Sequence, residues 1–257
     1  MPRSRDGDPL LLSLVTTAVV VAVLFLTPSC LKAGDLDPVF AESFDDHPDT
    51  PWGALPPGWW IEGEAAGARA RIADGRLLVD TTGPRGSTAT VWLDRDLPRD
   101  VEVSFDVHVV GSIREANNMN LLLHFRDPGA TSPLATRAER ADGRYAHYHS
   151  ERLGGTIITF LANGEPENAR LRVRMVPPFD PVLHESKGYH ARVGQTYRFE
   201  IVRQGDRLRV RIDGREVCNT VLPDNPAGSP GGYLGFRTWR TKLWWDNLIV
   251  RRPSPTP

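Results

Sequence analysis

The sequence has 257 residues, of which 40% are hydrophobic and 25% are charged, the ordinary composition of a globular protein. Its 31 Lys and Arg nearly balance its 32 Asp and Glu, and the net charge of −1 gives no electrostatic case for nucleic acid or an anionic membrane surface as a partner. Only two cysteines are present, which excludes a disulfide framework.

Residues 1–30 are predicted to be an export signal. Two arginines precede an uncharged apolar run from Leu10 to Leu26. The following Thr27-Pro28-Ser29-Cys30 resembles a bacterial lipobox, although the threonine stands where such motifs usually have leucine. We therefore expect Cys30 to become the lipidated first residue of the mature chain. A cleaved secretory signal and a retained anchor remain alternatives, and all three place the remaining chain outside the cytoplasm.

Residues 31–37 are predicted to be a tether, residues 38–252 a single domain and residues 253–257 a disordered tail. Short alternating or apolar runs, separated by turn signals such as Asp-Gly, fill the domain. The predicted strands cover residues 39–44, 59–62, 68–72, 76–80, 88–93, 101–110, 118–126, 145–149, 154–162, 168–176, 195–203, 207–213, 215–222 and two strands within 231–251. Cys218, in one of these runs, is predicted to be a small buried hydrophobe.

Two of the predicted strands carry mixed polar and aromatic faces. In strand 118–126, alternation points four apolar side chains toward the core, those of Met119, Leu121, Leu123 and Phe125. The opposite face then holds Asn118, Asn120, His124 and Arg126. In strand 145–149, one face holds Tyr145, His147 and His149. Charged strand faces seldom combine these residue types, so both rows are candidates for a functional surface.

The C-terminal stretch 231–251 is predicted to form two antiparallel strands joined by a polar turn around residues 240–242. In the first strand, one face holds Leu234, Phe236 and Thr238, and the other holds Tyr233, Arg237 and Trp239. In the second strand, the same alternation puts Leu248 and Val250, which continue the apolar set, on one face with Trp244 and Asp246. A closing strand this rich in Trp, Leu, Ile and Val is expected to lie centrally in a sheet.

These elements predict an all-β protein. A dozen or more short strands at 8–12-residue spacing, without a useful helical period after residue 30, favour a two-sheet antiparallel β-sandwich of the jelly-roll kind. Residues 127–144 and 177–193 are long loops, and the first is a candidate rim or lid.

The sequence resembles the concanavalin-A-like lectin/glucanase jelly-roll superfamily and, within it, the YesU-like family of bacterial proteins. The resemblance spans residues 39–251 and is carried by Glu62-Gly63-Glu64-Ala65, Tyr148-His149, Arg203-Gln204-Gly205, Gly235-Phe236-Arg237 and Asp246-Asn247. It implies a jelly roll and a link to bacterial polysaccharide breakdown. It carries no assignment of catalytic residues.

Sugars suit a sheet lined by aromatic and planar polar groups, because rings stack on their C–H faces while amides and guanidinium groups bind their hydroxyls. The substrate-binding candidates are Asn118, Asn120, Arg126, Arg237 and Trp239. The arginines of 207–211 form a plain charged face, whereas those of 170–174 fit either role. The acidic strand motif of glucanases is absent, so hydrolysis lacks its paired carboxylates.

β-Elimination on a uronate sugar needs a different set of groups. A cation or amide neutralises the carboxylate, while His or Tyr side chains move the protons near neutral pH. The catalytic candidates for this chemistry are His147, His149, Tyr145 and His124. These residue types also meet in many binding clefts, so catalysis stays a hypothesis.

No cofactor is required by the sequence. His147 and His149 have a spacing that metal sites use, but no third ligand accompanies them. Related jelly rolls often bind a structural calcium ion, and the resemblance makes Asp45, Asp46 and Asp246 candidate ligands for one.

The leading hypothesis is an exported, lipid-anchored protein of the cell envelope that binds and cleaves polysaccharide on a concave sheet. The alternative is a non-catalytic glycan-binding surface lipoprotein, and a structural envelope protein without a ligand is a third. The first two hypotheses require the rows beginning at Asn118 and Tyr145 to lie side by side on one sheet.

Overall fold

A computed structural model describes residues 38–83, 87–149, 152–162, 164, 166–223 and 231–254. The predicted signal, Cys30, the tether and the last three residues lie outside these ranges. The chain divides into a unit ending at Asp35 and a compact unit from Leu36 onward, and all described residues belong to the second. None of the helices in the described ranges has the length and apolar character that a membrane span requires.

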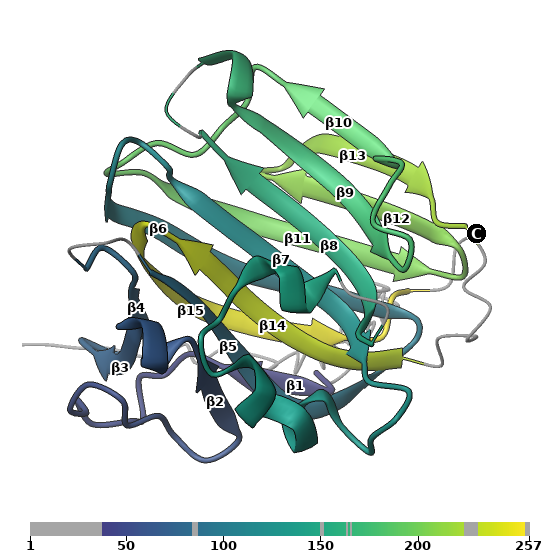
Figure 1. The fold of residues 1–257 in the computed structure, drawn as a ribbon. Coiled ribbons are helices and arrows are strands. Elements are labelled where there is room, and N and C mark those ends of the chain that lie inside the picture. The colour runs from purple at the N-terminus through teal and green to yellow at the C-terminus, as the bar shows by residue number, and fades with distance from the viewer. Residues whose placement is uncertain are drawn as a thin grey trace, which may run out of the picture. The chain divides into compact units, whose positions relative to one another are not determined.

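Two antiparallel sheets form the domain (Figure 1). Sheet A runs in the order β13 (Arg215–Val221), β12 (Arg207–Ile212), β11 (Thr196–Gln204), β6 (Val101–Ser112), β15 (Thr241–Arg251), β4 (Arg76–Asp80) and β3 (Arg69–Ala73), with β1 (Phe40–Glu42) also paired to β15. Sheet B runs in the order β10 (His184–Lys187), β9 (Arg170–Val176), β8 (Gly154–Leu161), β7 (Asn118–Arg126), β14 (Gly231–Trp239), β5 (Thr88–Pro98) and β2 (Trp59–Glu62). In the described ranges, four 3-10 helices lie between strands: η1 (Glu64–Ala66), η2 (Pro133–Arg140), η3 (Tyr145–Tyr148) and η4 (Pro166–Asn168). The predicted β-sandwich is confirmed.

The main core lies between the two sheets and follows the alternation of the strands. On β6 every second residue from Val101 to Val109 is buried. Phe105 stacks on Phe199 with 5.1 Å between ring centroids and meets Phe236 edge-on at 5.0 Å. Cys218 is buried in this core, as its sequence context predicted.

The C-terminal stretch is not a hairpin. β14 belongs to sheet B and β15 to sheet A, so the turn at Arg240 carries the chain from one sheet to the other. Thr241 fixes this corner: its N–H donates to Thr81 Oγ1 at 2.9 Å, and its Oγ1 accepts from Asn118 N at 2.9 Å. The predicted faces of β14 and the predicted central position of the closing strand, β15, are confirmed.

A β-bulge in β15 changes which tryptophan enters the core. The register with β6 shifts between Asp246 and Ile249, where Asn247 has a φ of 51°. An extra residue at a bulge reverses the alternation, so Trp245 rather than Trp244 shares the core face with Leu248. The faces predicted for the residues of β15 that precede the bulge are therefore wrong.

A second bulge redirects the end of β7. His124 has a φ of 57°, and the pairing with β8 shifts between Leu123 and Arg126. Leu123 faces the main core as predicted, but Phe125 turns to the opposite face of sheet B and His124 turns inward. Both residues lie on the faces opposite to those predicted for them.

The face of sheet B that points away from the main core, here called the outer face, is partly covered by the segment after β7. The predicted strand 145–149 is instead the helix η3, and η2 precedes it; in Figure 1 both lie in front of sheet B. Beneath them is a second apolar cluster, which consists of Trp92, Leu122, Phe125, Leu134, Tyr148, Leu153, Ile157 and Val176. The candidate lid is thus a packed cover over part of the outer face.

Candidate functional site

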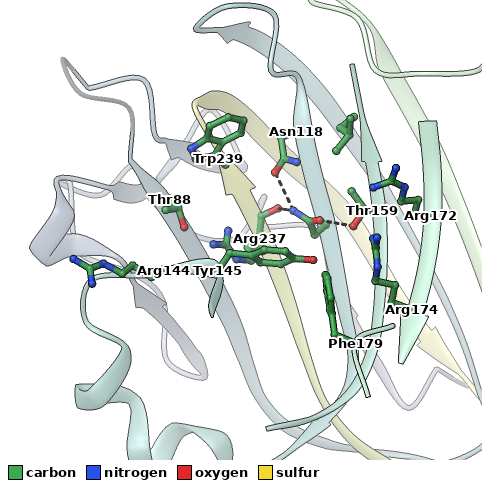
Figure 2. A pocket seen from close by; sticks show the side chains of 12 residues that line it. Thr88, Asn118, Arg144, Tyr145, Thr159, Arg172, Arg174, Phe179, Arg237 and Trp239 are labelled. Carbon is green, nitrogen blue, oxygen red and sulfur yellow. Dashed lines mark hydrogen bonds between the residues drawn. The ribbon is translucent and has the colours of Figure 1, made fainter. Parts of the chain in front are cut away.

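A pocket of about 510 Å³ occupies the part of the outer face beside this cover (Figure 2). Five strands of sheet B supply most of its lining, and the segment around η3 closes one side. The lining residues are Thr88, Asn118, Asn120, Arg144, Tyr145, Thr159, Leu161, Arg172, Arg174, Phe179, Arg237 and Trp239. The volume lies within the range of small-molecule sites in proteins.

Arg237 is the buried cation of the pocket floor, with 2% of its surface exposed. Its Nη2 donates to Gly143 O at 2.9 Å, and its guanidinium lies 5.0 Å from the ring centroids of both Tyr145 and Tyr148. Burial lowers the pKa of Arg237, while the two phenols and Glu62 oppose that shift. Contact with two aromatic faces stabilises a cation that water cannot fully solvate.

Next to Arg237, a row of hydrogen-bonded amide and hydroxyl groups crosses β7 and β8. Thr159 Oγ1 donates to Asn120 Oδ1 at 2.7 Å, and Asn120 Nδ2 donates to Asn118 Oδ1 at 2.9 Å. These bonds fix the orientations of both amides, and Asn118 and Asn120 both line the pocket. In Figure 2 the dashed lines mark these bonds, and the labelled Asn118 and Thr159 lie above the ring of Tyr145 in the view.

Three aromatic rings bound the pocket: Tyr145 and Phe179 on one side and Trp239 on the other (Figure 2). Tyr145 and Phe179 meet edge-on with 5.8 Å between centroids. Burial raises the pKa of the Tyr145 hydroxyl, so this group is a neutral donor and acceptor near neutral pH. Rings on either side of polar groups provide stacking surfaces for a flat ligand.

A buried ion pair beneath the pocket holds the cover in place. Arg140 Nη2 donates to Glu62 Oε1 at 2.7 Å and Arg140 Nε to the same oxygen at 3.0 Å. Tyr148 Oη donates to Glu62 Oε2 at 2.5 Å, and burial beside Glu62 raises the pKa of Tyr148 far above its usual range. Because Arg140 and Tyr148 belong to the cover and Glu62 to β2, these bonds join the cover to the edge of sheet B.

Gly143 connects this ion pair to the pocket. It has a φ of +64°, and a Cβ there would lie 2.7 Å from Thr88 O. Its carbonyl oxygen accepts from both Arg237 Nη2 and Thr88 Oγ1, the latter at 2.6 Å. Only glycine permits this close approach without strain, so the local sequence Asp-Gly-Arg-Tyr determines where Arg237 and Tyr145 lie.

Five of the predicted site residues meet in the pocket: Asn118, Asn120, Tyr145, Arg237 and Trp239. Only some members of the two predicted rows therefore lie next to each other on the outer face of sheet B. Tyr145 reaches this face from the helix η3 rather than from a strand. His149 does not line the pocket but packs on Phe179 at 4.6 Å between centroids.

The remaining predicted residues lie outside the pocket lining. His147 Nε2 donates to Asp142 Oδ1 at 2.6 Å on the outside of the cover. Arg126 pairs with Asp96 at 2.7 Å and bonds Gly231 O. His124 is buried on the inner side, where the bulge places it, and so cannot reach a ligand in the pocket.

Sequence reasoning missed five lining residues: Thr88, Arg144, Thr159, Leu161 and Phe179. Thr159 and Leu161 alternate with the core residue Phe160 on β8, so strand period alone could have found them. Arg144 and Phe179 lie in loops, where no periodicity applies. Arg172 and Arg174, whose role the sequence left open, do line the pocket.

The predicted calcium ligands are not assembled. Asp45 and Asp46 are exposed, and Asp246 Oδ2 lies 3.7 Å from Arg76 Nε, which provides a cation of its own. In the described part of the chain, no three His, Cys, Asp or Glu side chains are grouped to hold a metal ion. Burial, and then the charges of Asp45 and Asp106, raise the pKa of Asp246, but these groups do not form a complete ligand set, so the calcium ion stays a prediction.

Solved structures share this architecture. A protein of unknown function from Bacillus subtilis with a galectin-like fold matches with a TM-score of 0.67 and 12% identity over 85% of this chain and 97% of its own. The carbohydrate recognition domain of Emp47p matches with a TM-score of 0.58 and 12% identity over 83% and 95%. The exoplasmic/lumenal domain of VIP36, in a form bound to Ca²⁺ and Man3GlcNAc, matches with a TM-score of 0.54 and 12% identity over 78% of this chain and 86% of its own. No curated protein matches the sequence.

The fold and its pocket thus define a galectin-like, concanavalin-A-like β-sandwich with a cavity on the outer face of one sheet. Residues 84–248 match the family model DUF6250, described as a domain of unknown function, and the chain belongs to that family. The fold that the sequence resemblance implied is confirmed, whereas membership of the superfamily and of the YesU-like family stays a prediction.

Proposed function

We propose that the protein binds a saccharide in the outer-face pocket. The observation that carries this proposal is the combination of aromatic rings with fixed planar polar groups: Tyr145, Phe179 and Trp239 around Asn118 and Arg237. Such a surface matches the alternating C–H and hydroxyl faces of a sugar ring. The carbohydrate-binding functions in the descriptions of Emp47p and VIP36 support the same class of ligand.

Binding without cleavage is the form of the proposal that we favour. His124, His147 and His149 all lie outside the pocket, and the part of its lining that the structure describes contains no imidazole and no carboxyl group. Of the groups for β-elimination the pocket holds Arg237, Asn118 and Tyr145 but none of the three candidate histidines, and the described lining holds no carboxylate pair for hydrolysis. Incubation with uronate polysaccharides, followed by ultraviolet absorbance of unsaturated products, tests the catalytic alternative directly.

We further propose that the protein is exported and held at the membrane by a lipid on Cys30, and that it is related to the YesU-like proteins. The supporting features are the apolar run before Cys30 and the motifs Glu62–Ala65 and Tyr148-His149. Labelling cells with radioactive palmitate tests the anchor: label is expected on the wild type and not on Cys30→Ser.

Trp239→Ala tests the pocket itself. Loss of one stacking wall is expected to weaken saccharide binding roughly tenfold, which corresponds to about 1.4 kcal/mol. Isothermal titration or retardation on a polysaccharide affinity gel measures the change. Trp60→Ala is the matched control, because Trp60 is exposed on β2 away from the pocket. Equal affinities of wild type and Trp239→Ala for a bound saccharide would contradict the proposed site.

A further inference from the structure

The pocket has a strong imbalance of charge. Among the described residues, its lining contains four arginines, Arg144, Arg172, Arg174 and Arg237, and no aspartate or glutamate. A neutral sugar needs hydrogen-bond partners of both kinds, and a pocket built for neutral hydroxyls usually supplies acceptors as well as donors. Four guanidinium groups supply donors only.

Carboxylates near the rim offset part of this charge. Arg144 Nε lies 3.1 Å from Asp142 Oδ2, and Arg174 Nε lies 3.8 Å from the exposed Asp180. Arg172 pairs closely with Glu185. Glu185 is shared, however, because Arg170 Nη1 lies 3.4 Å and Lys187 Nζ 3.7 Å from its oxygens. One carboxylate therefore faces three cations on this edge of the pocket.

Among the described residues, the floor has no carboxylate of its own. Glu62, whose charge acts on Arg237, already accepts three hydrogen bonds from Arg140 and one from Tyr148. Arg237 donates only through Nη2, and its buried Nε has no partner. The buried Nε of Arg174 likewise has no hydrogen-bond partner. These two Nε atoms are closed off from solvent, so a ligand acceptor in the pocket can approach Arg237 and Arg174 only at the parts of their guanidinium groups that line it.

Three of these arginines converge on one place. The positive charges of Arg237, Arg174 and Arg172 all act on the Tyr145 hydroxyl, where they oppose the rise of its pKa. Figure 2 shows the same arrangement: Arg172 and Arg174 lie beyond the hydroxyl end of Tyr145, and Arg237 lies beneath its ring. The phenol hydroxyl thus marks a point of positive potential inside the pocket.

We infer that the pocket selects saccharides that carry a carboxylate or sulfate group, and that Arg174 and Arg237 bind that anion. This inference rests on the proposed saccharide function and specifies its ligand class. Guanidinium groups bind carboxylate and sulfate oxygens through charge-assisted, often paired hydrogen bonds, which are about twice as strong as neutral ones. The aromatic walls then contact the sugar ring that carries the acid.

The test compares each acidic glycan with its own neutral form. The probes are polygalacturonate, alginate and hyaluronate, each beside a carboxyl-reduced preparation, and carrageenan beside a desulfated preparation. Affinity electrophoresis and titration calorimetry measure binding at low and at physiological salt. We expect at least one acidic probe to bind tenfold or more tightly than its neutral form, with a preference that shrinks as salt screens the charges. The uronate and sulfate arms identify which anion is recognised.

Arg174→Gln is expected to remove most of the preference for the acidic form, measured as the ratio of the affinities for the acidic and the neutral form. Arg211→Gln is the matched control, because it removes an equal charge from the exposed face of β12 in sheet A. Arg174 is chosen over the buried Arg237 so that folding is preserved, and a thermal melt of each variant checks this.

The outcomes separate the two proposals. Binding of neutral and acidic forms with equal affinity, abolished by Trp239→Ala, would overturn the anion inference and leave the saccharide site standing. An acidic preference lost equally in Arg174→Gln and Arg211→Gln would also overturn it, since the selectivity would then come from net charge. Absence of binding to every probe would overturn both proposals together.

Discussion

Lowering the pH is expected to destabilise the domain through His124. Its Nε2–H donates to Pro98 O at 2.9 Å, and its Nδ1 accepts from Arg203 Nη1 at 2.7 Å. A second proton would have to go on Nδ1, where an arginine already donates. Burial, and then the charges of Arg203 and Arg126, lower the pKa of His124 from 6.5 to about 3.

The sign and size of this change in the free energy of unfolding follow from proton linkage. Between pH 6.5 and 3 the unfolded chain binds a proton at this histidine and the folded chain does not, so acid favours unfolding. The stability that neutral His124 provides is complete above pH 6.5 and is lost as the pH falls toward 3. Each pH unit in this window lowers the free energy of unfolding by up to ~1.4 kcal/mol, which gives a loss of about 2 kcal/mol at pH 5.

Urea unfolding at pH 7 and pH 5 measures this loss, with His124→Asn as the comparison. Asparagine tolerates the positive φ of this position and accepts a hydrogen bond, but it does not titrate. The variant loses packing at both pH values, so the readout is the difference between them. The wild type is expected to lose about 2 kcal/mol more than His124→Asn between pH 7 and pH 5. Equal losses in the two proteins would refute the reasoning.

Two substitutions test the cover and its attachment. Arg140→Met leaves the buried Glu62 charge without its partner and is expected to lower the free energy of unfolding by about 3–5 kcal/mol in urea titrations; the double variant with Glu62→Gln should recover much of that loss. Gly143→Ala forces a Cβ against Thr88 O, so it should lower the melting temperature in calorimetry by several degrees and weaken saccharide binding. Gly188→Ala has similar backbone strain in open space and should leave binding unchanged; parallel effects of the two alanines would contradict the role of Gly143.

Strand alternation predicted much of the fold because each sheet buries one face. It placed the core residues of β6 and the two faces of β14 correctly. It failed at His124 and Asn247, where a residue with positive φ inserts a bulge and reverses the phase. Both residue types favour that conformation, but alternation alone gives no sign of it.

The pairing partners of the strands were less accessible to prediction. A short polar turn at Arg240 is compatible with a hairpin, and only long-range bonds such as Asn118 N to Thr241 Oγ1 make it a crossing between sheets. Tyr-Ala-His-Tyr-His, residues 145–149, alternates like a strand, yet η3 forms there because Tyr148 is buried beneath the cover, bonded to Glu62.

In the candidate site, too, residues on strands were predictable and residues in loops were not. Asn118, Asn120, Arg237 and Trp239 were predictable because they lie on strands whose opposite faces are strongly apolar. Arg144 and Phe179 reach the pocket from loops, and their positions depend on contacts such as the Arg174 guanidinium 4.5 Å from the Phe179 ring. No local pattern encodes such contacts.

The crossing of the C-terminal stretch between the sheets has a consequence for synthesis. β14 is flanked by β7 and β5, and β15 by β6 and β4, so residues 231–251 join the two parts of each sheet. A ribosome that has made the first 230 residues has produced four half-sheets with open edges and no complete core. The domain must therefore fold after its last strands emerge, and stop codons or proteolysis ahead of β14 leave unpaired edges of the kind that aggregate.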